Sequence, residues 1–178
     1  MNEVNHHHES APAEFLVENI GLLPRGLALD TAMGSGRNAV YLAKMGFQVE
    51  GLDISQEAID DALRSAKESG VTIKARVADL EKDFHISQES YDVIICFNYL
   101  QHSLVPAIKG GLRRGGMVVY ETFIIDQAQF GKPKNPDYLL RHNELLEMFR
   151  EFRCLRSARG SSPDPGQLPA SLPRKSKA

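Results

Sequence analysis

Two closely spaced glycines and a later aspartate form the pattern in this sequence that best supports ligand binding. The segment from Gly34 to Ala39 reads G-S-G-R-N-A and fits the pattern G-x-G-x-x-G/A of nucleotide-binding loops. Glycines at these positions let the chain turn tightly and let a ligand approach the N-terminus of the following helix. Asp53 follows 17 residues after Gly36 and is suitably placed to bind both hydroxyls of a ribose. The pattern therefore predicts a site for a ligand that contains a nucleoside.

The charge of a second aspartate separates the ligand classes that such a loop can bind. Asp30 stands four residues before Gly34, at the end of a short apolar stretch. A carboxylate there would repel the pyrophosphate of a nicotinamide or flavin dinucleotide, whereas it would attract the α-ammonium group of S-adenosylmethionine. At ~4 Å and an effective dielectric constant of about 20, this attraction amounts to about 4 kcal/mol before desolvation. The charge therefore favours S-adenosylmethionine, and Asp79 is a candidate acceptor for its adenine amino group.

Each of these aspartates also has a structural interpretation. Asp30 could accept a hydrogen bond in a turn, although its combination with the glycine loop favours ligand binding. Asp53 could cap the helix that follows, but Ser55 already supplies a suitable N-cap. Asp79 fits a turn well, so its assignment is the most open of the three.

The three aspartates follow stretches with the pattern of β-strands, and helical stretches lie between them. Strands are expected at 27–29, 47–52, 71–77, 91–97 and 117–123, with one more beginning at 153–155. Helices are expected at 14–22, 40–46, 55–70, 103–112 and 143–152. This alternation predicts an α/β fold, in which right-handed crossovers place helices on both faces of a parallel sheet.

Length and composition exclude several classes of protein. The chain has 178 residues, of which 42% are hydrophobic and 25% are charged, as in one ordinary globular domain. The net charge of −2 gives no basic excess for a nucleic-acid partner. No apolar run approaches the ~20 residues of a membrane span, and the N-terminus lacks a signal-peptide pattern. With only Cys96 and Cys154, a disulfide framework or zinc site is not expected, and the sequence predicts a cytoplasmic protein.

Charge and proline are concentrated at the C-terminal end. Residues 156–178 hold five basic side chains and one acidic one, so they carry +4 and residues 1–155 carry −6. Four of the nine prolines lie in the same segment, which shows no strand or helix periodicity. We therefore expect a flexible N-terminus over 1–12, one folded domain over 13–156 and a disordered Pro/Ser-rich basic tail over 157–178.

The motifs together resemble a known family. The stretches L-D-T-A-M-G-S-G-R-N (29–38), G-L-D-I-S (51–55) and A-D-L (78–80) resemble the class I S-adenosylmethionine-dependent methyltransferases. Within that family, residues 97–100, 115–116, 120–123 and 130–137 make the sequence most similar to the tellurite-resistance methyltransferase group. The resemblance runs from about Ala13 to Leu155, which is most of the chain.

The resemblance implies a fold, a cofactor and a set of binding residues. The fold is a Rossmann-like three-layer sandwich whose mostly parallel, seven-stranded sheet has the order 3-2-1-4-5-7-6 and ends in an antiparallel hairpin. The cofactor is S-adenosyl-L-methionine. Its site would include eleven residues of the quoted motifs: Asp30, Ala32, Gly34, Gly36, Arg37, Asn38, Asp53, Ile54, Asp79, Leu80 and Phe97.

The sequence departs from the family at three places. Ala32 stands at the first small position of the glycine motif, where alanine also permits the close approach of a ligand. His102 stands where relatives usually carry arginine, which weakens any prediction of a charged substrate contact there. After a strand that begins near Phe152, no partner strand is evident, because the Pro/Ser-rich tail follows. We therefore expect an altered C-terminus and an incomplete sheet edge.

The expected activity is direct transfer of a methyl group to a small-molecule acceptor. Candidate substrate residues are Tyr41, Tyr99, His102, Glu121 and Phe130. Tyr41, Tyr99 and Phe130 could cover the sulfonium, whereas Asn98, Tyr99 and Glu121 are evenly divided between substrate contact and structural hydrogen bonding. No residue has the pattern of a general base, which fits a soft or already anionic acceptor. The loop 124–141 and the first twenty residues would form a lid.

Other functions remain open on the sequence alone. The chain could bind S-adenosylmethionine without turnover, or, less consistently with Asp30, act as an NAD(P)-binding oxidoreductase. A monomer and a homodimer are both compatible with the sequence. No metal site is expected, because adjacent histidines such as His6–His8 near a terminus lack a preformed geometry.

Overall fold

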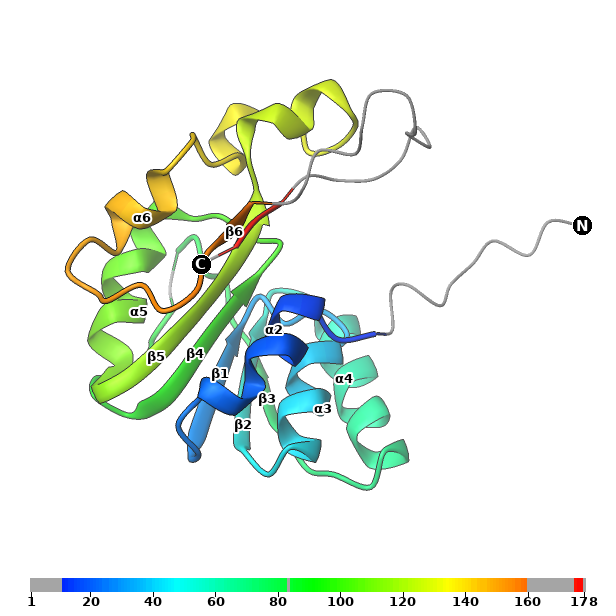
Figure 1. Cartoon of the computed structure of the whole chain (residues 1–178). Helices are drawn as coiled ribbons and strands as arrows, with labels where there is room; N and C mark the ends of the chain where they lie inside the picture. The colour runs from blue at the N-terminus through cyan, green and yellow to red at the C-terminus, as the bar shows by residue number, and fades with distance from the viewer. Residues whose placement is uncertain (1–10, 83, 160–174, 178) are drawn as a thin grey trace, which may run out of the picture.

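The structure is a computed structural model that describes residues 11–82, 84–159 and 175–177. Its strands form one seven-stranded sheet in the order β3-β2-β1-β4-β5-β7-β6 (Figure 1). Five of them pair in parallel, namely β1 (Leu27–Thr31), β2 (Gln48–Asp53), β3 (Lys74–Val77), β4 (Tyr91–Phe97) and β5 (Leu112–Phe123). The predicted α/β fold is confirmed, and the strand order is the one that the resemblance implied.

Helices cover both faces of the sheet (Figure 1). On one face lie α2 (Glu14–Asn19), α3 (Arg37–Lys44) and α4 (Gln56–Glu68), and on the other lie α5 (Val105–Gly111) and α6 (Glu144–Met148). Four short 3₁₀ helices complete the described elements: η1 (Ile20–Leu22), η2 (His102–Leu104), η3 (Ile125–Gln129) and η4 (Pro136–Tyr138). No helix in these described parts of the chain is long and apolar enough to cross a membrane.

The central strand β4 shows how the two layers bury the sheet. Val93 and Ile95 pack into the core on the α2–α4 side, whereas Ile94 and Cys96 pack into the core on the α5–α6 side. Successive side chains of a strand point to opposite faces, so the apolar run from Val93 to Phe97 needs cover on both. Burial raises the pKa of the Cys96 thiol to about 11, so this group is a neutral core side chain and not a nucleophile.

The start of α4 follows directly from its sequence. The Ser55 hydroxyl accepts a hydrogen bond from the Ala58 backbone N–H at 3.2 Å, as the predicted N-cap. Ile59, Ala62 and Ala66 then face the core, at the spacing that one helix face requires.

The C-terminal edge of the sheet corrects one prediction. The strand β7 (Lys175–Lys177) pairs antiparallel with Glu121–Phe123 of β5, and β6 (Ala158–Arg159) pairs antiparallel with β7. The expectation that no partner strand follows was wrong, and the strand expected at 153–155 lies at β6 instead. A lysine-rich strand of three residues has no apolar alternation, so periodicity could not reveal it. Residues 1–10 and 160–174 lie outside the described residues, so the expected flexible start and disordered tail remain predictions there.

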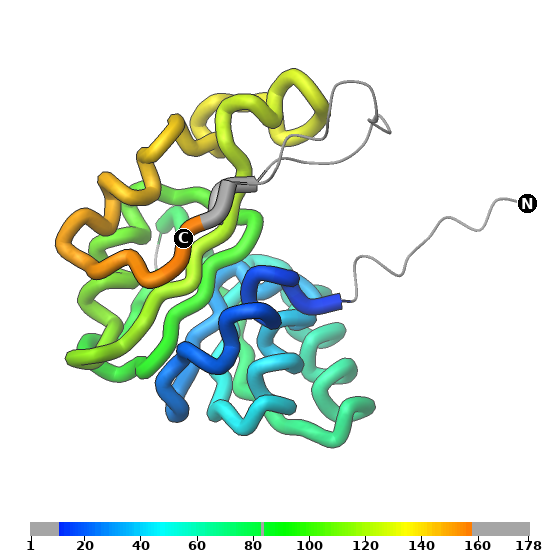
Figure 2. The backbone as a smooth tube through the Cα atoms, viewed as in Figure 1, coloured from blue at the N-terminus to red at the C-terminus, as the bar shows by residue number. Residues whose placement is uncertain are grey.

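Two further boundaries differ from the sequence-based expectation. The strand β5 begins at Leu112 and runs through Gly115 and Gly116, whereas it was expected to begin at residue 117. The loop 124–141 contains η3 and η4, and Figure 2 shows it extending beyond the end of β5 and returning. A bridge between Ile124 and Leu140 closes the loop at its base.

Candidate functional site

The predicted ligand residues meet at the carboxyl edge of the parallel strands. Asp30 lies in β1, Asp53 ends β2 and Phe97 ends β4, so neighbouring parallel strands bring the three to one edge. A cavity of about 430 Å³ opens there. Its wall consists of Asp30, Ala32, Met33, Gly34, Ser35, Arg37, Asn38, Phe97, Asn98 and Tyr99. Six of the predicted cofactor residues are in this wall.

The glycine loop is held in place by β2. The Met33 N–H donates to the Leu52 carbonyl at 2.9 Å, and the Gly34 N–H donates to Asp53 Oδ2 at 2.8 Å. Gly34 has a φ of +55°, and a Cβ built there would meet nothing within 4 Å. Open space beside this backbone leaves room for a ligand to approach closely, as the sequence pattern predicted.

Gly36 serves packing rather than the cavity. Its φ is +80°, and a Cβ built there would lie 2.6 Å from the Cβ of Ala62 in α4. The glycine therefore lets α4 pack against the start of α3, and Gly36 is not in the cavity wall. Gly51 in β2 has a similar role, because a Cβ there would collide with Met33 of the glycine loop.

Asp30 is the residue whose environment most clearly calls for a ligand. Its side chain is 1% exposed, and its Oδ2 has no hydrogen-bond partner among the described residues. Burial raises the pKa of this carboxyl to about 8; Arg37 and the Ala39 backbone N–H oppose the rise, and Asp53 adds to it. A buried carboxylate oxygen without a partner costs free energy that a cationic group would recover. This orphaned oxygen fits the α-ammonium group of S-adenosylmethionine.

Asp53 and Asp79 are both oriented by backbone amides. Asp53 accepts the Gly34 N–H through Oδ2 and the Ser55 N–H through Oδ1 at 2.9 Å, and each oxygen keeps a lone pair for a ribose hydroxyl. A backbone hydrogen bond from Glu81 lowers the pKa of Asp79, and Lys82 Nζ lies 3.3 Å from its Oδ2. Asp79 is therefore an ionised acceptor, although neither carboxylate is in the wall of the 430 Å³ cavity.

The two predicted aliphatic contacts have opposite environments. Ile54 is 66% exposed directly after β2, which is unusual for so large an apolar side chain. Leu80, in contrast, is buried in the core on the α5–α6 side. Ile54 is thus available to contact a ligand, whereas Leu80 packs in the core beneath the carboxyl edge of the sheet.

Arg37 and Asn38 tie the N-terminal segment to the glycine loop. Asn38 Oδ1 accepts the Ala13 N–H at 2.8 Å, and Arg37 Nη1 donates to the Ala11 carbonyl at 3.3 Å. The chain before α2 therefore crosses the start of α3, beside the cavity wall to which both side chains belong.

A second cavity, of about 670 Å³, adjoins the first. The two share Asn98 and Tyr99. Its remaining wall comes from Glu81 and from the loop and its base: Leu100, Phe123, Lys132, Pro133, Lys134, Asn135 and Tyr138. The loop 124–141, predicted as a lid, therefore encloses a space next to the glycine-loop cavity.

The shared residues are firmly positioned. Asn98 has a φ of +59°, a strained conformation for a residue other than glycine, and its N–H donates to the Glu121 carbonyl at 2.8 Å. The Tyr99 carbonyl accepts a hydrogen bond from the Tyr120 hydroxyl at 2.9 Å. Burial, followed by the charge of Glu81, raises the pKa of Tyr99 to about 12, so its phenol remains protonated near neutral pH.

The other predicted substrate residues lie outside both cavity walls. Tyr41 packs against the core beneath α3, and His102 Nε2 lies 3.2 Å from Glu144 Oε1. Glu121 is buried at the end of β5, opposite Phe97, and Phe130 follows η3 in the loop. The aromatic rings of Tyr41 and Phe130 and the positions of His102 and Glu121 suggested these residues, but of the five candidates only Tyr99 lies in a cavity wall.

The sequence reasoning missed the residues that the loop contributes. Lys132 and Lys134 belong to the predicted lid, but no motif distinguishes them from other lysines. Met33 and Ser35 stand between the motif positions that were selected, so their place in the wall could have been found. Among the described residues, no group of three or more His, Cys, Asp or Glu side chains could hold a metal; His6–His8 lie outside them.

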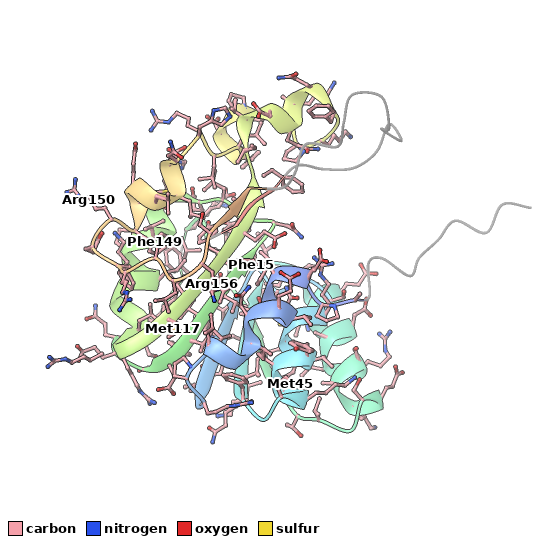
Figure 3. All side chains as sticks on the ribbon, viewed as in Figure 1. Phe15, Met45, Met117, Phe149, Arg150 and Arg156 are labelled. Carbon is pink, nitrogen blue, oxygen red and sulfur yellow. The ribbon has the colours of Figure 1, made fainter. Side chains whose placement is uncertain are left out.

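An apolar groove elsewhere shares no residue with either cavity. It has a volume of about 480 Å³ and follows β5 between the segment from Phe15 to Leu23 and the segment from Leu145 to Arg156. Figure 3 shows Met117 on β5, with Phe149 on one side of the strand and Phe15 on the other; all three residues line the groove. The groove contains no residue of the glycine loop, so we do not assign the predicted chemistry to it.

Comparisons with known proteins agree with this geometry. The family model described as "Methyltransferase domain" matches residues 28–116, which include the glycine loop. Over 104 residues the chain is 35% identical to the ubiquinone biosynthesis O-methyltransferase of Actinobacillus pleuropneumoniae; the match covers 53% of this chain and 44% of that protein. The chain thus spans less than half the length of this curated relative.

Two solved structures share the fold. TehB from Haemophilus influenzae has a TM-score of 0.77 at 18% identity, over 96% of this chain and 63% of that one. A TehB-like S-adenosylmethionine-dependent methyltransferase from Corynebacterium glutamicum has a TM-score of 0.53 at 24% identity, over 77% and 69%. Together with the family match, these observations show that the chain belongs to the class I S-adenosylmethionine-dependent methyltransferases.

Proposed function

We propose that this chain binds S-adenosylmethionine in the 430 Å³ cavity and transfers its methyl group to a small molecule in the adjoining 670 Å³ cavity. The observation that carries this proposal is the wall that the two cavities share, Asn98 and Tyr99. A donor and an acceptor on either side of these residues would meet without crossing bulk water.

The 430 Å³ cavity, which we call the donor cavity, and the strand ends beside it offer a group for each polar part of the cofactor. In this proposal, Asp30 binds the α-ammonium group, Asp53 the ribose hydroxyls and Asp79 the adenine amino group. The exposed side chain of Ile54 covers the nucleoside. The unpartnered Oδ2 of Asp30 supports the first of these assignments, and the lone pairs left on the Asp53 carboxylate support the second.

The reaction needs positioning more than acid–base chemistry. When bound, S-adenosylmethionine supplies a methyl group activated by a sulfonium. In the transfer, the lone pair of the acceptor would form the new bond to the methyl carbon as the carbon–sulfur bond breaks, and the electron pair of the broken bond would stay on sulfur. The chain's part is to align the two molecules and exclude water, and the protonated Tyr99 phenol can donate a hydrogen bond at the junction.

The relatives support the donor more than the acceptor. Ubiquinone biosynthesis O-methyltransferases are named for transfer to oxygen on a small molecule, and we propose a small-molecule acceptor here as well. The family match ends at residue 116, before the loop that encloses the second cavity. The loop therefore supplies the part of the acceptor cavity that the family match does not cover.

Isothermal titration calorimetry with S-adenosylhomocysteine and with NAD tests the proposal. We expect binding of the first and none of the second. Ile54→Ala should weaken S-adenosylhomocysteine binding about fivefold, because about 1 kcal/mol of apolar contact is lost. The half-exposed Leu63 on α4 offers a matched control, and Leu63→Ala should leave the affinity unchanged. Absence of S-adenosylhomocysteine binding would refute the proposal.

A further inference from the structure

The 670 Å³ cavity, which we call the acceptor cavity, has one cationic wall, formed by Lys132 and Lys134. Both lysines are exposed, and neither forms an ion pair with any described residue. Elsewhere in the described chain, Lys74, Lys82 and Lys109 do pair with carboxylates. Two uncommitted ammonium groups in one cavity wall are therefore available to a ligand, in a molecule whose first 155 residues carry −6.

The loop that carries these lysines is anchored to the sheet. The Leu140 N–H donates to the Phe123 carbonyl at 2.9 Å, and the Ile125 N–H donates to the Leu140 carbonyl at 2.8 Å. Inside the loop, the Gln127 side chain, which is 3% exposed, donates to the Lys132 carbonyl at 3.0 Å. A buried side chain thus fixes the backbone of Lys132 over the cavity.

The opposite side of the cavity is negative. Glu81 is the acidic side chain in its described wall. The charges of Glu81 and Asp79 both reach Tyr99, where they oppose ionisation of the phenol after the larger effect of burial. The cavity is therefore polarised, with positive charge at the loop and negative charge toward the junction with the donor cavity.

Size and apolar surface indicate the rest of the ligand. A volume of about 670 Å³ lies within the range of sites for organic ligands and far exceeds a bare inorganic oxyanion. Leu100, Phe123, Pro133 and Tyr138 supply apolar and aromatic surface. A charged group at one end and an apolar body would match this cavity.

We propose that the methyl acceptor is an organic carboxylate, bound through its carboxylate by Lys132 and Lys134, with an aromatic or aliphatic body. The carboxylate lies at the loop and the reacting atom lies at Asn98 and Tyr99, beside the donor cavity. This assignment rests on the proposed methyltransferase function.

Calorimetry on the full chain saturated with S-adenosylhomocysteine tests the assignment. The probes are a panel of hydroxybenzoates and mercaptobenzoates, each matched with its neutral benzamide. We expect at least one benzoate to bind about tenfold or more tightly than its amide, a difference of about 1.4 kcal/mol per factor of ten. The same benzoate should release S-adenosylhomocysteine from S-adenosylmethionine in a turnover assay.

Variants then locate the charge. Lys132→Gln with Lys134→Gln should reduce benzoate affinity about tenfold and leave amide affinity unchanged. The exposed Lys67 on α4, which has no described ion pair, gives the matched control Lys67→Gln, with no expected change. S-adenosylhomocysteine affinity should be the same in all variants.

Three results in the binding experiments would overturn the assignment: no benzoate of the panel binds, acid and amide bind equally, or the double variant keeps full benzoate affinity. Methylation of selenite with no methylation of any benzoate would also overturn it. Each is distinguishable from failure of the proposed function, because that failure appears first as absence of S-adenosylhomocysteine binding.

Discussion

The two cavities that meet at Asn98 and Tyr99 are built in different ways. The donor cavity is formed by strand ends and a glycine loop within residues 30–38, together with the end of β4. The acceptor cavity depends on a loop of the chain, closed at its base by the pairing of Ile124 with Leu140. Strand ends are fixed by the sheet, whereas a loop can change its side chains without disturbing the core. Under the proposed function, this difference would let a general donor site be combined with a particular acceptor site.

The largest expected effect is on the donor side. Asp30→Asn should weaken S-adenosylhomocysteine binding about 100-fold, because an interaction with a charged partner contributes about 1.5–3 kcal/mol. Asp61 on the exposed side of α4 supplies the control, and Asp61→Asn should leave binding intact. Calorimetry measures both, and equal affinities for the two variants would remove Asp30 from the donor site.

The same carboxyl should also make stability depend on pH. Because burial raises the pKa of Asp30 from 3.8 to about 8, the folded state holds this proton more tightly than the unfolded state. The contribution of this proton to the free energy of unfolding is fully present below pH 3.8 and is lost as the pH rises through about 8. Urea denaturation from about pH 5 to pH 9 should show the unfolding free energy falling by up to about 1.4 kcal/mol per pH unit.

Asp30→Asn separates the contribution of Asp30 to the pH dependence of the unfolding free energy from the contributions of other titratable groups. The variant should be more stable than the wild type at high pH, and its profile should be flatter. Identical pH profiles for the two proteins would show that Asp30 is already ionised and satisfied in the folded chain.

Alanine should destabilise the protein more at Gly36 than at Gly34 and should affect the ligand cavity only at Gly34. Gly36→Ala should lower the free energy of unfolding by about 2 kcal/mol, because the new Cβ meets Ala62 in addition to the strained φ. Gly34→Ala adds only the strain of a positive φ, so it should cost about 1 kcal/mol in stability but narrow the donor cavity. Urea denaturation measures the loss of stability in each variant, and calorimetry with S-adenosylhomocysteine measures the effect on the donor cavity. Equal stability losses would contradict the packing role of Gly36.

The smallest expected effect belongs to the loop. Gln127→Ala removes the hydrogen bond to the Lys132 carbonyl and should raise the KM for a methyl acceptor about threefold. Affinity for S-adenosylhomocysteine should not change, since Gln127 is outside the donor wall. A parallel loss of both affinities would show that the two cavities are not independent.

Local chemistry determined what could be predicted from the sequence. The burial of β4, the cap at Ser55 and the place of Asp30 all follow from short-range patterns, and the structure has them. Gly34 and Gly36 look equivalent in the motif, and only the approach of α4 distinguishes their roles. Tyr41 was a candidate because its aromatic ring could cover a sulfonium, but in α3 it packs against the core.

Long-range contacts account for the rest. Lys132 and Lys134 reach the site because the loop returns to Phe123, a contact that no local pattern encodes. The strand β7 consists of Lys-Ser-Lys, whose pairing with β5 depends on its partner and not on its own periodicity.

A crystal structure with S-adenosylhomocysteine bound tests the central claim most directly. We predict that the α-ammonium group of the ligand lies within hydrogen-bond distance of Asp30 Oδ2, and that the sulfur of the ligand faces Asn98 and Tyr99, toward the acceptor cavity. A ligand bound in the apolar groove along β5, or one whose sulfur faces away from the acceptor cavity, would contradict the account.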